Sequence, residues 1–442
     1  QSRRQTSYMH AATTRPSSRS PRLLTQAPHR LMFFIGASNL LLAMAWWAMW
    51  LADARWQLFG LRQPQPYAGW LHAFVMQYQM LPSFMFGFLL TVFPRWMGLP
   101  EIDRWRYLPV GLGLVGGQLA TLAGSFGFGP GVVVGYWMTL AGWLAGVATL
   151  GPLLKRERGT TWHARACFLG LSLGLLGLLA WGAFLLGGDA RLAFASIKLG
   201  TFGLLLPVYF SVAHRMFPFF AGNAVSGYVA WRPLWLLGAV LALCLTHLGL
   251  ELLHAYAWLW LADLPLLALL LVAQWKWWPR GPAPGLLQVL FLGLAWLPLS
   301  IGLYAFQSIA YSLTGEFLLG RAPAHALFIG FFGDKLTITT IAGANIFLFV
   351  FNVCGGALRH SPFWISFGPR VEKWVISPAM HQIHHSDKPE HFDRNMGGSL
   401  AVWDRMFGTL HIPKGREIEN FGIGPETPDF RSMDVILLRP FE

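Results

Sequence analysis

Three histidines near the C-terminus, His381, His384 and His385, have a spacing that suits metal binding. They lie in HQIHHS and form the pattern H-x-x-H-H. Residues at positions i, i+3 and i+4 share one face of a helix, so the three imidazoles can converge on one centre. Neutral imidazole is a ligand for iron, copper and zinc. The pattern therefore predicts a metal site on a short helix, to which other residues add ligands.

Further ionisable residues lie inside long apolar stretches. Lys198 and Asp263 are each flanked by apolar residues, and we expect them to pair, either as a structural ion pair or as part of a proton path. His247 and His254 are seven residues apart, which places them on one helix face. A lone histidine is more often a hydrogen-bonded helix residue than a ligand. Several in one bundle favour a haem or copper site.

Composition indicates which elements must position these residues. Of the 442 residues, 55% are hydrophobic and 12% are charged, whereas a soluble domain carries about 25% charged residues. About 20 apolar residues are enough to cross a bilayer. Segments of this kind occur ten times, at 31–52, 70–93, 107–126, 131–154, 166–188, 192–213, 233–250, 257–275, 284–313 and 325–355. The sequence predicts an all-α, polytopic transmembrane helix bundle.

The net charge of +13 is unevenly distributed, because residues 1–333 carry +14 and residues 334–442 carry −1. With the N-terminus placed in the cytoplasm, the inside segments hold 17 Lys and Arg residues and the outside loops hold 4. Cytoplasmic loops are enriched in these residues, so we expect both termini to be cytoplasmic. The basic excess suits anionic lipid rather than nucleic acid. Residues 1–30, with six Arg and no acid, are expected to be a disordered tail.

Three blocks of the membrane half resemble the NnrS family of bacterial inner-membrane proteins. They are WLHAFVMQYQMLPSFMFGFLLTVFPRWMG (70–98), VAHRMFPFFAGNAV (212–225) and RAPAHALFIGFFG (321–333). The resemblance implies a haem- and copper-containing protein linked to nitric-oxide or respiratory metabolism. It also implies His72, His325 and His214 as haem or copper ligands. The family pattern near the second span, W-x-H-E-M, is only partly present, since Ala73 follows His72.

The sequence from 351 to 413 resembles the end of the fatty acid hydroxylase/sterol desaturase superfamily. The similar pieces are R-H-S around His360, S-P-x-M-H-x-I-H-H-S (377–386), D-x-N-x-G (393–397) and W-D-R-M-F-G-T (403–409). The resemblance implies a membrane di-iron oxidoreductase that uses O₂ to hydroxylate or desaturate lipids. The iron ligands it implies are His360, His381, His384 and His385. Asp393 and Asn395 would either orient the metal ligands by hydrogen bonds or structure a loop. His391 and His411 are expected to be surface residues.

The earlier histidine motifs of that superfamily are absent, because residues 1–350 contain no two histidines three or four apart. The tail alone therefore has too few imidazoles for two irons, which need roughly eight. Two alternatives stay open. Either membrane-half histidines turn toward the tail, for which His214 is on the correct side, or one iron or zinc ion binds at His381, His384 and His385 together with His360.

We expect the two families to join at 333/334, where DKLT brings two charges into an apolar run. The predicted domains are thus the tail 1–30, an NnrS-like transmembrane domain 31–333, and a hydroxylase-like segment 334–442, in which residues 356–442 form a small cytoplasmic cap. A natural gene fusion, a truncated tail and an artefact joining two neighbouring genes each account for such a join.

Three functional hypotheses follow. The first is an NnrS-like haem or copper protein of the bacterial inner membrane that carries an incomplete hydroxylase tail. The alternative is an O₂-dependent di-iron lipid hydroxylase or desaturase. The third is a catalytically inactive chimera. Membrane lipids are the expected partners, and for the second hypothesis they are also the substrate.

Overall fold

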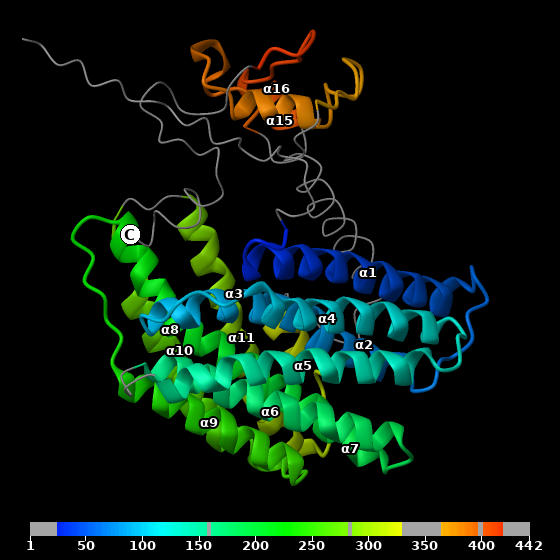
Figure 1. Cartoon of the computed structure of the whole chain (residues 1–442). Helices are drawn as coiled ribbons and strands as arrows, with labels where there is room; N and C mark the ends of the chain where they lie inside the picture. Colours follow the sequence, from blue (N-terminus) through cyan, green and yellow to red (C-terminus); the bar gives the residue numbers. More distant parts are fainter. Residues whose placement is uncertain (1–23, 157–160, 282–284, 329–363, 397–400, 419–442) are drawn as a thin grey trace, which may run out of the picture. The chain divides into compact units, whose positions relative to one another are not determined.

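A computed structural model of the chain describes residues 24–156, 161–281, 285–328, 364–396 and 401–418. Within these ranges the regular elements are helices, and no strand is present. Nine of the helical segments in them are long and apolar enough to cross a membrane (Figure 1). The predicted all-α, multi-span architecture is therefore confirmed. The tenth predicted segment, 325–355, overlaps the short helix α12 (Ala322–Phe328) and otherwise lies outside the described residues.

Seven spans consist of one long helix, and the other two are interrupted by a π-helical turn. The uninterrupted helices are α1 (Pro28–Trp56), α4 (Arg104–Ser125), α5 (Gly131–Arg156), α6 (Trp162–Leu185), α9 (Leu234–Leu252), α10 (Trp260–Trp277) and α11 (Gly285–Thr314). The 3-10 turn η4 (Tyr256–Trp258) precedes α10. The interrupted spans are α2 (Ala68–Phe74), η2 (Val75–Met80) and α3 (Leu81–Trp96), and then α7 (Ala190–Lys198), η3 (Leu199–Leu205) and α8 (Leu206–Ala224).

The chain divides into two compact units. The first contains Gln1–Trp46, Leu61–Arg215 and Pro233–Ala255. The second contains Trp47–Gly60, Met216–Arg232 and Tyr256–Glu442. The predicted domain boundary at 333/334 lies in the undescribed stretch 329–363, so it stays a prediction.

Helices α4 and α5 approach closely because glycines face each other across their contact. A Cβ atom added to Gly113 would lie 2.5 Å from the Cα atom of Gly142, so a larger residue would push the two helices apart. Figure 1 shows α4, α5 and α6 running side by side. Small residues of this kind let helix backbones gain van der Waals contact where lipid supplies no hydrophobic drive for association.

The π-helical turn of the second span has an identifiable cause. Pro82 has no N–H, so the Tyr78 carbonyl four residues earlier loses its helical partner. The indole Nε1 of Trp143, on α5, donates to that carbonyl at 2.8 Å. In the same turn, Gln77 donates to the Thr201 hydroxyl of η3 at 2.8 Å, so the two π-helical turns are bonded to each other. Turns of this type are frequent at functional sites.

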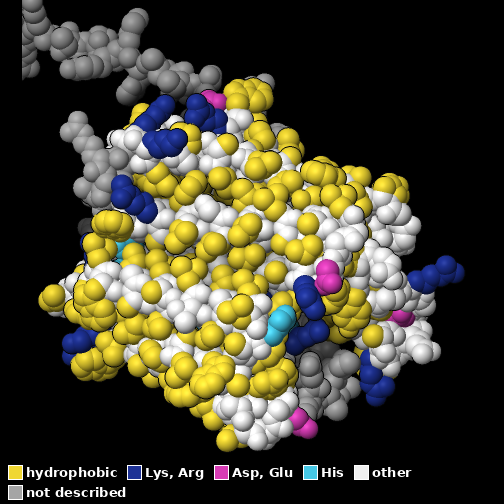
Figure 2. Space-filling model, turned by 90° about the horizontal axis from the view of Figure 1, so that it is seen from below, with side chains coloured by type: hydrophobic (Ala, Val, Ile, Leu, Met, Phe, Trp, Pro, Cys, Tyr) yellow, Lys and Arg dark blue, Asp and Glu magenta, His cyan; other side chains and the backbone are white. Residues whose placement is uncertain are grey.

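The helices expose apolar side chains, among them Trp105, Trp137 and Leu144. Figure 2 shows hydrophobic side chains over much of one face of the molecule, interrupted by few Lys and Arg side chains. Soluble monomers rarely expose large continuous apolar surfaces. Together with the nine candidate spans, this surface identifies a multi-pass membrane protein.

The described part of the C-terminal segment contains the short helices α15 (Pro378–His384) and α16 (Val402–Phe407) and the 3-10 turn η6 (Pro389–His391). Its buried apolar cluster is small: Ile376, Met380 and Ala401, with Leu410 packed against it. Hydrogen bonds of buried polar groups also hold this segment together. The Glu372 carboxylate, for example, accepts hydrogen bonds from Ser366, the Phe367 backbone and Ser377 at 2.6 to 3.0 Å.

Candidate metal centres

Helix α15 positions the H-x-x-H-H motif. Ser377 caps its N-terminus through a bond from the Met380 backbone N–H at 3.2 Å, and a proline follows at the first helical position. The helix ends at His384, so His385 is the C-cap residue. His381 is buried, His384 is half-buried and His385 is exposed. The motif therefore runs from the interior of the segment to its surface.

The three imidazoles converge. The Nε2 atoms of His381 and His385 lie 3.2 Å apart, and the ring centroids of the three residues are 4.7 to 5.5 Å apart. Two bonds of about 2.1 Å to one metal ion would span 3.2 Å at an angle of about 100°. His384 Nδ1 lies 3.2 Å from the Arg394 carbonyl, which leaves Nε2 as its metal-binding atom. His360, the fourth predicted ligand, lies outside the described residues.

Asn395 organises the loop that follows the motif. It is fully buried, has a left-handed φ of 51°, and donates to the carbonyls of Met380 and His411 at 3.0 and 2.9 Å. Its Oδ1 accepts the His411 backbone N–H at 2.8 Å. The loop-structuring role expected of this residue agrees with these bonds. Asp393 also has a positive φ, of 57°, but it is exposed.

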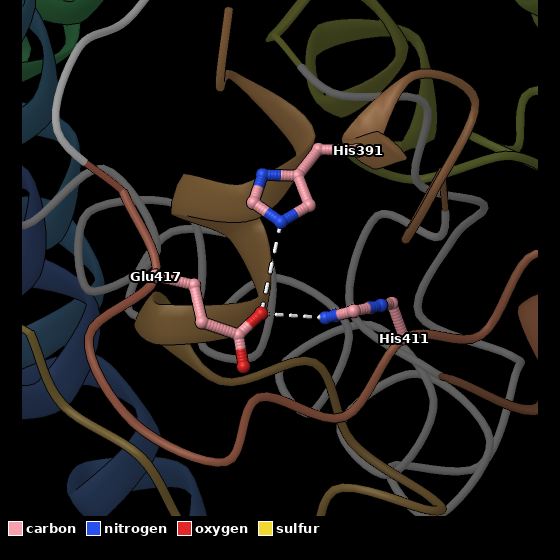
Figure 3. A group of neighbouring side chains, drawn as sticks. All are labelled: His391, His411 and Glu417. Carbon is pink, nitrogen blue, oxygen red and sulfur yellow. Dashed lines mark hydrogen bonds and ion pairs between the residues drawn. The ribbon is translucent and has the colours of Figure 1, made fainter. Parts of the chain in front are cut away.

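A second group of potential ligands was not expected from the sequence. His391, His411 and Glu417 point toward one another (Figure 3), and one ligand atom from each lies within 4.8 Å of the others. The expectation that His391 is a surface residue is wrong, since it is only 3% exposed, while His411 is half-buried. The spacing 391, 411 and 417 matches no motif, because loop geometry rather than helix periodicity brings the three together.

The environment of Glu417 favours its charged form. Partial burial acts to raise its pKa, but this is outweighed by three stabilising influences. The Lys414 backbone N–H bonds to the carboxylate, His411 bonds to it, and the charges of His411 and His391 lie close by, so that the net effect is a lowered pKa. This carboxylate is therefore ionised at neutral pH.

In the membrane half, two buried imidazoles contact each other. His163 Nε2, near the start of α6, lies 2.9 Å from Nδ1 of His214 on α8. His214 Nε2 lies 3.1 Å from the Pro233 carbonyl, which fixes this nitrogen as the protonated one. Sequence reasoning singled out His214 and missed His163. The available signal was that both residues lie at span ends predicted to face the same side of the membrane.

The other membrane-half candidates are His72 and His325. His72 is on α2 at the start of the second span, 24 residues before Trp96 at its end. Arg215 stacks 4.8 Å from the centre of the Trp96 ring, so His214 and His72 are about 35 Å apart along the span. His325, on α12, is half-buried, with its Nδ1 2.9 Å from the Arg321 carbonyl. Thus His72 and His214 cannot bind the same metal ion.

Lys198 was expected to pair with Asp263, but it forms its ion pair with Glu251. Lys198 Nζ lies 2.8 Å from Oε1 of Glu251, and the same oxygen lies 3.6 Å from His247 Nε2. His247 is buried and stacks on Phe202. The prediction that His247 and His254 share a helix face is wrong, because α9 ends at Leu252 and His254 follows with a φ of 56°.

Comparison with known proteins gives two family matches. The family model described as NnrS protein matches residues 23–341, and the model described as fatty acid hydroxylase matches residues 303–409. The two matches overlap at 303–341, a range that includes the predicted join. No solved structure matches.

Curated relatives are similar to the hydroxylase part. Alkylglycerol monooxygenase from Xenopus tropicalis is 36% identical over 63 residues, which are 13% of this chain and 14% of that protein. The Danio rerio alkylglycerol monooxygenase is 41% identical over 54 residues, 11% of this chain and 12% of that protein. The chain thus spans about one eighth of the length of these relatives.

Proposed function

Because the chain belongs to the NnrS family, we propose that it is a transition-metal protein of the bacterial inner membrane that acts in nitric-oxide or respiratory metabolism. The observation that carries this proposal is the buried pair of His163 and His214. A histidine pair enclosed by membrane helices is costly to keep without a function, because each imidazole loses its hydration. We infer that the pair binds copper.

The pair fits a copper ion better than a haem. Two bonds of about 2.0 Å to nitrogen atoms 2.9 Å apart subtend an angle of about 90°, the arrangement of neighbouring ligands around tetragonal Cu(II). The Pro233 carbonyl orients His214 as an outer partner would. A haem needs one imidazole with a flat space beside it, whereas each of these rings lies against the other, with centroids 5.1 Å apart and planes tilted by 36°. Bound copper would supply a redox centre.

His72 and His325 are the proposed ligands for haem. Each is a single half-buried imidazole, which is the donor that haem iron takes from a protein. Metal analysis and an optical spectrum of the purified full chain test the copper and the haem proposals. A Soret band that is lost in His72→Ala or His325→Ala supports haem at that residue. A preparation without any haem absorption contradicts it.

We propose that both termini are cytoplasmic, as the loop charges favour. Single cysteines placed in the exposed parts of the loops, on the background of Cys167→Ser, Cys244→Ser and Cys354→Ser, test this. In intact cells an impermeant maleimide should label the loop at 57–67 and leave the loop at 97–103 unlabelled. The reverse pattern would overturn the orientation.

A second candidate function is oxidation of a lipid by the tail. It is favoured by the convergence of His381, His384 and His385 and by the match to the fatty acid hydroxylase model. No two histidines in residues 1–350 lie three or four positions apart in the sequence. We therefore infer that the tail binds one metal ion rather than two irons. About two irons per chain, lost together in His381→Ala, would instead support a di-iron lipid hydroxylase. A tail without bound metal would support an inactive chimera.

A further inference from the structure

We propose that His391, His411 and Glu417 form a second metal site in the tail, which binds one zinc ion. Figure 3 shows the three side chains directed at one point from three separate parts of the chain. His391 ends the turn η6, His411 follows α16, and Glu417 lies in the loop beyond. Two histidines and one glutamate are an established ligand set for zinc, which leaves a fourth position for water.

One of the two distances to Glu417 suits a shared metal ion better than a direct hydrogen bond. The 3.6 Å between His391 Nε2 and Glu417 Oε2 is too long for a hydrogen bond. Two bonds of about 2.0 to 2.1 Å that meet near a tetrahedral angle separate their ligand atoms by about 3.4 Å. His411 Nε2 lies closer, 2.8 Å from the same oxygen, and this contact must widen by several tenths of an ångström when zinc enters.

Outer partners already orient two of the three ligands. His391 Nδ1 lies 2.8 Å from the Ser386 hydroxyl, so its Nε2 is the nitrogen directed at the site. Glu417 Oε1 accepts the Lys414 backbone N–H at 2.8 Å, so Oε2 is directed at the histidines. Metal-binding histidines and carboxylates characteristically have such partners, which fix the tautomer and the orientation of the ligand.

The site would tie together chain segments that are otherwise joined mainly by polar bonds. Ser386, which orients His391, directly follows His385 of the H-x-x-H-H motif. Asn395 holds the His411 backbone at one end and the Met380 carbonyl of α15 at the other. Zinc at this site would therefore fix the end of the motif helix relative to residues 411–417. This ion would be separate from the one proposed at His381, His384 and His385.

Zinc content of the full chain tests the proposal. Purified protein is stripped with a chelator, titrated with zinc alone, and compared with Glu417→Gln, which keeps the side-chain size and removes the charge. Glu390→Gln, an exposed acid beside His391, is the matched control. We expect Glu417→Gln to bind one zinc ion fewer per chain than wild type and Glu390→Gln to bind the same number. Equal zinc content in all three proteins would overturn the site and leave an ion pair only.

Two further variants separate ligand loss from misfolding. His411→Gln removes a half-buried ligand and should also remove one zinc ion per chain. Ser386→Ala retains all three ligands and should weaken zinc binding about 10- to 100-fold without changing the stoichiometry. The second readout is limited proteolysis, in which zinc should protect residues 386–418 of wild type but not of Glu417→Gln. Protection by zinc in both proteins would contradict the proposal.

Discussion

The ammonium group of Lys198 lies 2.8 Å from the carboxylate of Glu251, and their side chains are only 22% and 3% exposed. Lys198 ends α7 directly before the π-helical turn η3, and Glu251 lies in the last turn of α9. The interrupted span that begins with α7 is therefore joined to α9 by an ion pair whose two side chains are largely buried.

Removing the acid alone should be more harmful than removing both charges. Glu251→Leu leaves Lys198 without its counter-charge, which should lower the free energy of unfolding by about 3 kcal/mol. The double variant Lys198→Met with Glu251→Leu should regain most of that loss. Thermal unfolding in detergent measures both. Equal losses in the single and the double variant would show that the pair contributes through packing rather than charge.

The bond from Trp143 to the Tyr78 carbonyl can be isolated with a cycle of two substitutions. Trp143→Phe leaves this buried carbonyl without its donor and should cost about 1 to 3 kcal/mol. Pro82→Ala restores a backbone N–H four residues after Tyr78, so Trp143→Phe should cost less in that background. The same unfolding measurement applies. If Trp143→Phe costs the same in both backgrounds, the bond does not explain the π-helical turn.

Asn395 offers a test of how the tail is organised. Asn395→Gly keeps the left-handed backbone and removes the bonds to Met380 and His411, which should cost about 3 kcal/mol. Asp393→Gly is the matched control, because Asp393 has a similar φ and is exposed. We expect faster protease cleavage within residues 386–418 for the first variant alone. Similar cleavage of both variants would show that the introduced glycine, rather than the loss of the Asn395 hydrogen bonds, causes the faster cleavage.

The lowered pKa of Glu417 gives a pH dependence with a definite sign. A depressed folded-state pKa contributes stability above the ordinary value of 4.5 and loses it as pH falls through the lower folded value. In zinc-free protein, the contact of Glu417 with His411 should therefore persist at pH 5 and be lost below pH 4.5. Protease resistance of the tail across this range measures it. Glu417→Gln should lack the transition, and a wild-type transition above pH 5 would contradict the assignment to this carboxylate.

The membrane architecture could be predicted because the bilayer imposes one dominant rule. Apolar runs of about 20 residues are forced into helices that satisfy their own backbone bonds. The nine spans that the structure describes follow this rule. The two π-helical turns were not predictable in the same way. The one at η2 depends on Trp143, which comes from a different span and meets the carbonyl left free by Pro82.

The sites were less predictable than the spans. The H-x-x-H-H motif is local, so helix periodicity alone brings His381, His384 and His385 together. The pairs that depend on tertiary contact escaped sequence reasoning, as with His163 beside His214 and His391 beside Glu417. Pairing Lys198 with Asp263 failed for the same reason, because the acid that Lys198 contacts is Glu251. The orientation of the chain and the join at 333/334 stay predictions.

The most direct test of the central claim is the copper content of the full chain after His214→Ala, measured on protein purified from copper-supplied cells. His163→Ala is the second test variant, and His254→Ala, an exposed histidine beyond the end of α9, is the control. We predict about one copper ion per chain in wild type and control, and its loss in both His214→Ala and His163→Ala, because the two imidazoles are the proposed ligands of one ion. Unchanged copper in these two variants, with the fold intact, would contradict the account.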